Sequence, residues 1–148
     1  AHAQSADDYV DAGIEKGKSG DLQGAIADFN KAIQIDPQFA PAYLNRGVAK
    51  GKSGDSQGEI ADYNKAIEID PQYALAYRNR GTLKGESGDH QGAIADYTKA
   101  IEINPQSAYA YKMRGGSKGI LGDMQGACTD LKQAYLLGDK DGFNRFCR

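Results

Sequence analysis

Positively charged side chains recur four residues apart along the chain, and a carboxylate recurs with each pair. The pairs are Arg46 and Lys50, Arg80 and Lys84, and Arg114 and Lys118, with Ala12 and Lys16 at the same places near the start. The carboxylates are Asp28, Asp62, Asp96 and Asp130. Residues four apart share a helix face, so the pattern indicates either structural ion pairs, whose alkyl stems cover apolar surface, or an anion-binding stripe. We favour ion pairs, because each cationic pair has a carboxylate nearby.

The residue types that build catalytic and metal sites are scattered. His2 and His90 are the only histidines, and no group of Cys and His has the spacing of metal ligands. No Gly-rich phosphate loop follows a strand, and no nucleophile is paired with a base. We therefore expect no enzymatic activity, no metal and no cofactor.

One stretch explains how the charged residues are positioned. Gly20 begins the sequence GDLQGAIADFNKAIQIDPQ, and close copies begin at Gly54 and Gly88, with a more divergent copy at Gly122. The spacing is 34 residues each time. A self-similar unit of this length is typical of a stacked array of helical repeats.

Each unit reads as helix, turn, helix, turn. In the unit from Ala40 to Tyr73 the apolar residues follow a helical spacing on both sides of Gly54 and Asp55. Asp55 can cap the second helix, and Pro71 ends it near Asp70. Neither helix can bury its apolar face alone, so the units must stack.

The repeat resembles the tetratricopeptide repeat family in its large and small residues. Tyr43, Gly47, Tyr63, Ala66 and Pro71 match the family pattern, whereas Glu59 stands where Ala is usual. The resemblance implies an all-α, right-handed superhelical solenoid with four units. These units are 6–39, 40–73, 74–107 and 108–137, preceded by segment 1–5 and followed by a short capping helix over 138–148.

Glycine recurs where the first helix of each unit approaches its end, at Gly17, Gly51, Gly85 and Gly119. Gly inside a helix costs about 1 kcal/mol relative to Ala. The glycines indicate either an opened groove, since the family's concave face lies here, or an early frayed end of each first helix.

By resemblance, the concave face formed by the first helices binds an extended peptide or partner segment, as in a non-enzymatic interaction scaffold. The amides of Asn45 and Asn79 offer both donor and acceptor for a peptide backbone. A carboxylate clamp of the kind known in the family is not expected, because only Asn45 of its five positions agrees. The expected peptide-binding residues are Leu44, Asn45, Val48, Arg78, Asn79, Thr82, Tyr109, Lys112 and Met113.

The C-terminal end suggests an alternative, a self-assembly module that forms a homo-oligomer. Phe143, Phe146 and Cys147 follow a helical spacing and are expected to cover the fourth unit. If they leave its end uncovered, Leu131 and Tyr135 would join them in an exposed apolar patch that favours association.

Charge and hydropathy limit the remaining partners. The net charge of −2 and a pI of about 5.7 argue against nucleic acid. A mean hydropathy of −0.63 and the absence of a long apolar run argue against a membrane span.

The opening AHA fits the remnant of a secretory signal, or equally a cloning scar, so both an exported and a cytoplasmic location stay open. Cys128 and Cys147 could pair in an oxidising compartment, but Cys128 holds the slot of Ile26, Ile60 and Ile94, which favours a buried packing thiol.

Overall fold

The computed structural model describes residues 3–143 and residue 147. Within them the chain forms helices and no strands, which confirms the all-α fold of helical hairpins predicted from the repeat. The helices are α1 (Ala6–Lys18), α2 (Leu22–Ile35), α3 (Ala40–Lys52), α4 (Ser56–Ile69), α5 (Ala74–Glu86), α6 (His90–Ile103), α7 (Ala108–Ile120) and α8 (Met124–Leu136).

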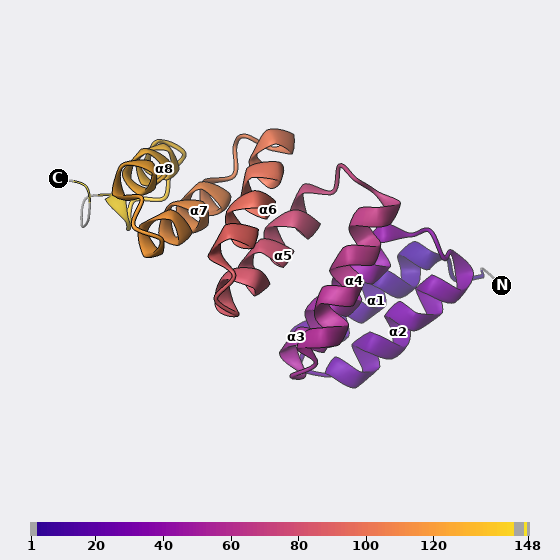
Figure 1. The fold of residues 1–148 in the computed structure, drawn as a ribbon. Helices are drawn as coiled ribbons and strands as arrows, with labels where there is room; N and C mark the ends of the chain where they lie inside the picture. Colours follow the sequence, from indigo (N-terminus) through magenta and orange to yellow (C-terminus); the bar gives the residue numbers. More distant parts are fainter. Residues whose placement is uncertain (1–2, 144–146, 148) are drawn as a thin grey trace. The chain divides into compact units, whose positions relative to one another are not determined.

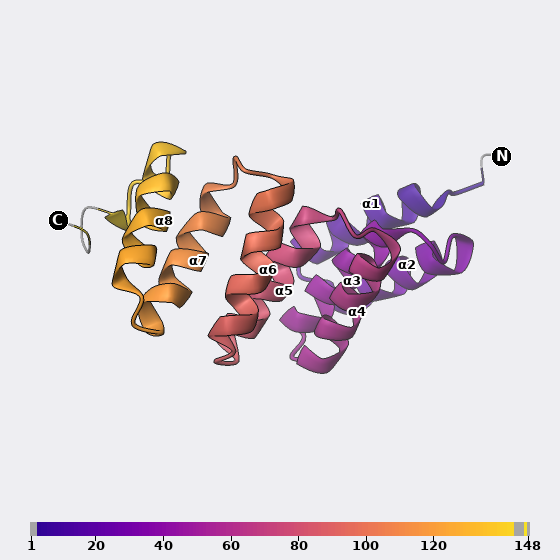
Figure 2. The ribbon, with the colours of Figure 1, turned by 45° about the horizontal axis from the view of Figure 1, so that its top comes forward.

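The helices belong to two compact units of two repeats each. Unit 1 is Ala1–Pro71 and contains α1 to α4, and unit 2 is Gln72–Arg148 and contains α5 to α8. In unit 1, α1 packs on α2, α2 on α3 and α3 on α4 (Figure 1). Unit 2 repeats this order, and Figure 2 shows α5 to α8 as two successive hairpins.

The helix boundaries follow from the residues that punctuate each repeat. Asp55 accepts a hydrogen bond from the backbone N–H of Gly58 at 2.8 Å and so caps α4, as expected. Asp21, Asp89 and Asp123 cap α2, α6 and α8 in the same way. Helix α4 ends at Ile69, directly before Asp70 and Pro71.

The turn inside each hairpin requires glycine. Gly20, Gly54, Gly88 and Gly122 have φ angles of 90–92°, in the left-handed region that is strained for residues with a Cβ. The 34-residue spacing of these glycines therefore places a sharp reversal at the same point of every repeat.

The core of unit 1 consists of side chains from the two faces of each hairpin. Phe29 is buried between small residues, among them Ala6, Ala25 and Ala32, and Tyr9 and Ile14 pack against this cluster. In unit 2 the ring of Tyr97 is almost fully buried. The repeated aromatic residues thus serve mainly as packing.

The segment after α8 turns back along that helix. Phe143 packs against Tyr135 with ring centroids 5.8 Å apart, and Cys147 forms a disulfide with Cys128. The interpretation of Cys128 as a packing thiol was therefore wrong, because the returning segment brings the two Cα atoms within 5.5 Å. Residues 138–142 form turns and bends, so a capping helix over the whole of 138–148 was wrong for this part, where the chain has left α8 to turn back. Phe146 lies outside the described residues, as do Ala1 and His2 of the AHA start.

Candidate functional site

The repeated cations and carboxylates form ion pairs inside each hairpin. Asp62 is 4 % exposed and accepts two hydrogen bonds from Arg46, at 2.8 Å from Nε and 2.7 Å from Nη2. Lys50 lies 3.3 Å from the same carboxylate. Asp96 and Asp130 hold their Arg and Lys partners in the same geometry, and Lys16 pairs with Asp28 at 2.7 Å. The prediction of structural ion pairs is confirmed.

These arginines also join neighbouring repeats within a unit. The remaining nitrogen of Arg46 donates to Asn30 of the preceding repeat at 2.8 Å, and Arg114 donates to Thr98 at 3.2 Å. The hydrogen bond to Asp62 raises the pKa of Arg46 above its ordinary value, and Asp130 does the same for Arg114. Each guanidinium is used in hydrogen bonds that hold the repeats together, so few of its N–H groups are left to bind an external anion.

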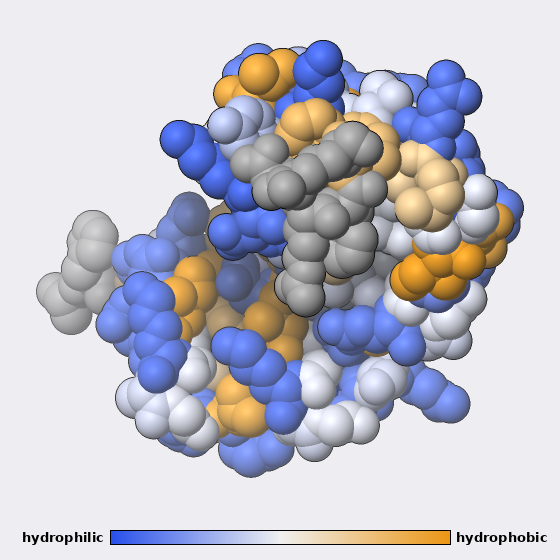
Figure 3. Space-filling model, turned by 90° about the vertical axis from the view of Figure 1, so that its left-hand side faces the viewer, coloured by the Kyte–Doolittle hydropathy of each residue, from blue (hydrophilic) through white to orange (hydrophobic). Residues whose placement is uncertain are grey.

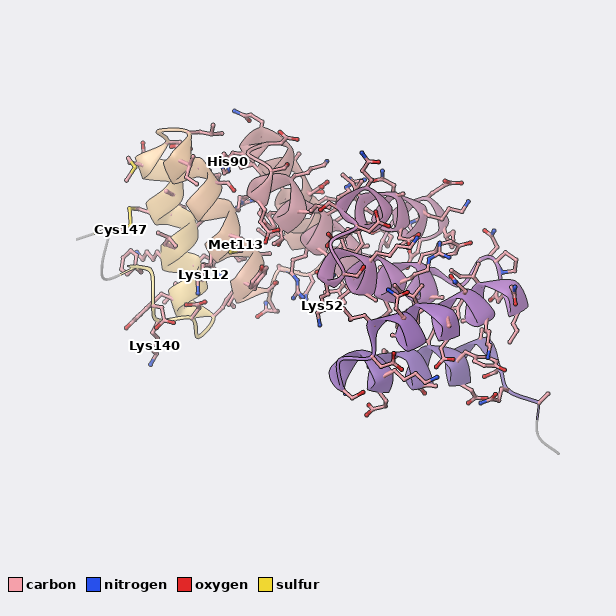
Figure 4. The ribbon with its side chains drawn as sticks, turned by 90° about the horizontal axis from the view of Figure 1, so that it is seen from below. Lys52, His90, Lys112, Met113, Lys140 and Cys147 are labelled. Atoms are coloured by element: carbon pink, nitrogen blue, oxygen red, sulfur yellow. A yellow bond between two sulfur atoms is a disulfide. The ribbon has the colours of Figure 1, made fainter. Side chains whose placement is uncertain are left out.

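A concave apolar space of about 700 Å³ lies in unit 2, and we call it the unit 2 hollow. Its lining comes from the C-terminal part of α5, from α6, from α7 between Lys112 and Ile120, from α8, and from the segment after α8. Met113 lines it from the middle of α7, and Figure 4 shows this residue with Lys112 and with His90 at the start of α6. Its lining residues are Thr82, Gly85, Glu86, His90, Tyr97, Lys112, Met113, Gly115, Gly116, Ser117, Gly119, Ile120, Met124, Ala127, Cys128, Leu131, Gly142 and Cys147.

The hollow exists because glycines face alanines across each hairpin. A Cβ placed on Gly85 would meet only Ala93 at 3.6 Å and Ser117 at 4.0 Å, and one on Gly119 would meet Ala127 at 3.6 Å. A Cβ on Gly116 would meet nothing within 4 Å. These glycines lie inside α5 and α7, so the open space results from missing side chains.

Unit 1 shows what fills such a space. Glu59 stands where the other repeats have Ala, and its carboxylate occupies the position that a side chain on Gly51 would need. The hydroxyl of Tyr63 donates to Glu59 at 2.9 Å and holds it there. The departure from the family pattern at Glu59 therefore closes at Gly51 what remains open at Gly85, whereas a Cβ on Gly17 of unit 1 would meet only Ala25, at 3.9 Å.

Three hydroxyl groups are bonded to one another beside the hollow. Tyr97 donates to Thr82 at 2.9 Å, the hydroxyls of Thr82 and Tyr109 are 3.2 Å apart, and Thr82 donates to the carbonyl of Arg78 at 3.1 Å. Burial raises the pKa of Tyr97. The guanidinium of Arg78 lies over the ring of Tyr109, 4.9 Å from its centroid, and its buried Nε has no hydrogen-bond partner among the described residues.

The segment after α8 contributes one wall. Gly142 and Cys147 line the hollow, and the disulfide joins this segment to α8 at Cys128, which also lines it. Lys112 donates to Asp139 at 2.9 Å. This hydrogen bond lowers the pKa of Asp139 and raises that of Lys112.

The residues predicted to bind a peptide fall into two groups, one in each unit. In unit 2, Thr82, Lys112 and Met113 line the hollow, while Arg78 and the 41 %-exposed Tyr109 form a stacked pair. Asn79 is half-buried on α5.

In unit 1, Val48 and Asn45 line a smaller groove of about 120 Å³. Asn45 already donates to the carbonyl of Pro41 at 2.8 Å, and Leu44 is only 2 % exposed. Leu44 is therefore left out of the surface proposed below.

Sequence reasoning named Gly85 and Gly119 as groove-opening positions but missed the bulky residues around them. Ile120 is 68 % exposed, and Met124 is also exposed beside it in the lining. Ile120 is the last residue of α7 and Met124 the first of α8, and the repeats differ in sequence at both positions. The sequence did contain a signal for these residues. Ile120 is apolar at a position where other repeats have the charged residues Lys52 and Glu86.

Other kinds of site find no support in the part of the chain that the structure describes. No group of three or more His, Cys, Asp or Glu side chains there could hold a metal ion. No described helix is long and apolar enough to cross a membrane.

The fold defines a class, the repeat scaffolds of helical hairpins that mediate protein–protein interaction. Models described as TPR repeat and tetratricopeptide repeat match residues 18–54, 40–73 and 74–107. The chain belongs to the tetratricopeptide repeat family. A search of curated protein sequences gave no significant match.

Solved structures with the same fold include those of three other proteins. MamA is 27% identical over 91% of this chain and 79% of its own, with a TM-score of 0.82. The first TPR domain of Spaghetti (RPAP3), bound to the HSP90 peptide SRMEEVD, is 23% identical over 82% and 97%, with a TM-score of 0.76. PilF of Pseudomonas aeruginosa is 20% identical over 90% and 61%, with a TM-score of 0.84.

Proposed function

We propose that this protein is a non-enzymatic scaffold that holds a segment of a partner protein in the unit 2 hollow. The observation that carries the proposal is the unit 2 hollow, an apolar space of about 700 Å³ opened by Gly85, Gly116 and Gly119. Solvent-exposed apolar surface that is concentrated in one concave region is typical of a binding site. Membership of a family of interaction repeats supports a protein as the ligand.

The residues of the proposed surface have distinct roles. Met113, Ile120 and Met124 supply adaptable apolar contact. Arg78, stacked on Tyr109, offers a cation next to the hollow. In unit 1, Asn45 and Val48 line a groove that is open to the same kind of partner but much smaller.

A photo-crosslinking amino acid at position 113 tests the proposal in lysate of the native host. Position 132 on α8 is the matched control, because Lys132 is exposed but does not line the hollow. We expect position 113, and not position 132, to form adducts with a defined protein, identified by mass spectrometry. Equal adducts at both positions would show that the hollow is no binding site.

Self-association through the C-terminal end is the alternative function. Leu136 is 67 % exposed near Tyr135 and Phe143, and Figure 3 shows hydrophobic residues among hydrophilic ones on the side that carries this end. Light scattering of the wild type and of Phe143→Asp separates the two functions. A mass equal to the monomer at all concentrations rules out the alternative.

A further inference from the structure

Apart from Gly142 and Cys147, the residues that line the unit 2 hollow belong to helices, and this restricts what can lie in it. Backbone N–H and C=O groups inside a helix are already bonded to each other. The hydroxyls of Thr82 and Tyr97, which also line the hollow, are bonded to one another at 2.9 Å. Apart from the buried Nδ1 of His90, which has no hydrogen-bond partner among the described residues, the floor of the hollow thus offers few free donors or acceptors.

An extended segment would lose hydrogen bonds on entering this space. Its backbone groups would leave water without finding partners on the floor, at a cost of about 1–3 kcal/mol for each unsatisfied group. A helical segment satisfies its own backbone and presents only side chains. The lining therefore discriminates between the two conformations.

The dimensions agree with two turns of a helix. Along α7 the lining runs from Lys112 to Ile120, eight residues or about 12 Å of helix rise. Apolar side chains at i, i+3 or i+4, and i+7 of a partner helix span the same length. A volume of about 700 Å³ is in the range of pockets for drug-sized ligands, so several side chains can enter together.

The charged groups around the hollow determine which charge the partner should carry next to its apolar residues. Lys112 is neutralised by Asp139 at 2.9 Å. Glu86 is exposed at the end of α5, lines the hollow and has no ion pair among the described residues. A basic residue beside the apolar stripe of the partner would meet this carboxylate.

From these observations we infer that the partner segment is an amphipathic helix, with apolar residues at i, i+3 or i+4, and i+7 and a Lys or Arg next to them. The inference rests on the proposed function and specifies its ligand. The glycines and alanines of unit 2 accommodate this helix, whereas Glu59 covers Gly51 in unit 1 and the groove there measures only about 120 Å³.

The test selects from a phage-displayed library of random 16-residue peptides on the full chain, with counter-selection on Ala93→Glu. In unit 1, Glu59 is held by Tyr63 and covers Gly51. A Glu at position 93 would lie in the same way between Tyr97 and Gly85, and so would fill the hollow there. Glu59→Ala in unit 1 is the matched control. Ile120→Asp is the second blocking variant, since an exposed residue tolerates the change if Ala93→Glu fails to fold.

We expect enriched peptides to carry the apolar stripe with a neighbouring basic residue and no central Pro. Their synthetic forms should gain helical circular dichroism on binding and lose at least tenfold in affinity when Pro is placed mid-sequence. The Glu86→Lys variant should bind these peptides more weakly. Peptides in which the basic residue is changed to Glu should recover affinity for that variant.

Two other results would overturn the inference, and they can be told apart. Enriched peptides with alternating apolar residues or central Pro, which still require the open hollow, would refute the helix and leave the proposed function intact. If no peptide distinguishes the wild type from both blocking variants, the helix and the proposed function both fail. Unchanged affinity in Glu86→Lys would refute the basic flank.

Discussion

At the scale of single residues, the buried aspartates join the two helices of each hairpin. Asp62 accepts two hydrogen bonds from Arg46 and lies within 3.3 Å of Lys50, although it is only 4 % exposed. A carboxylate so deeply placed is tolerated because two cations and a bidentate geometry compensate its desolvation.

Removing this carboxylate should therefore be costly. We expect Asp62→Ala to lower the free energy of unfolding by about 2–3 kcal/mol, because it leaves Arg46 and Lys50 partly buried without their partner. Urea unfolding followed by circular dichroism measures the loss. Asp11→Ala, at an exposed position, is the control and should stay within about 0.5 kcal/mol. A loss as small as that of the control would mean that the ion pair stabilises nothing.

Asp139 makes the contact of the C-terminal segment with α7 sensitive to acid. Its hydrogen bond with Lys112 lowers the pKa of the carboxyl below its ordinary value of 3.8. A depressed folded pKa contributes stability that is complete above the unfolded pKa and is lost as the pH falls through the folded one. We expect the ¹³C carboxyl signal of Asp139 to titrate below pH 3.8, and Lys112→Ala to move this midpoint upward. An unmoved midpoint would contradict the ion pair.

At the scale of helices, the two kinds of repeated glycine have different causes. Gly47 faces the ring of Tyr63, where an added Cβ would lie 2.9 Å from a ring carbon and 3.2 Å from the Cβ of Asp62. Gly119 faces open space, where the nearest atom would be 3.6 Å away. The first glycine permits close packing of helices, and the second shapes the hollow.

Substitution by Ala should separate them. Gly47→Ala is expected to destabilise the protein by about 1–3 kcal/mol through overpacking. Gly119→Ala should stabilise it by up to about 1 kcal/mol, because Ala is the better helix former. Thermal melting of both variants measures the difference. Destabilisation by Gly119→Ala would contradict the open space described beside it.

The disulfide between Cys128 and Cys147 ties the C-terminal segment to α8 over a separation of 19 residues. Closing a loop of this length stabilises a fold by about 3 kcal/mol in the chain-entropy model. We expect a dithiol reductant to lower the urea midpoint of the wild type and to leave a Cys128→Ser, Cys147→Ser double variant unchanged. Equal midpoints of the wild type with and without reductant would show that the bond is absent or without effect.

The hairpins and their boundaries were predictable from the sequence, but the hollow only in part. Asp55, Gly54 and Pro71 act locally, so their effect on a helix end can be read directly from the chain. Whether a glycine opens a groove depends on what faces it, Glu59 in one repeat and Ala127 in another, and this requires the packed hairpin. The disulfide was considered but not favoured, because the path of the segment after Gly138 follows no repeat.

At the scale of the whole molecule, the two units share a frame and differ in what they present. The ion pairs and the capped turns recur in both. The unit 2 hollow has a volume of about 700 Å³, against about 120 Å³ for the groove of unit 1. The invariant part of the repeat therefore maintains the fold, and the proposed specificity lies where repeats diverge.

The most direct measurement is a titration of the ¹⁵N-labelled 148-residue chain with the tightest peptide from the selection. The amides of Gly85, Gly116 and Gly119 line the hollow and report on its occupation. Our account predicts that their signals, with those of Met113 and Ile120, shift together and saturate, while Gly17 and Gly51 in unit 1 do not move. Shifts centred on unit 1, or spread over the exposed face of α8 around Lys132, would contradict the central claim.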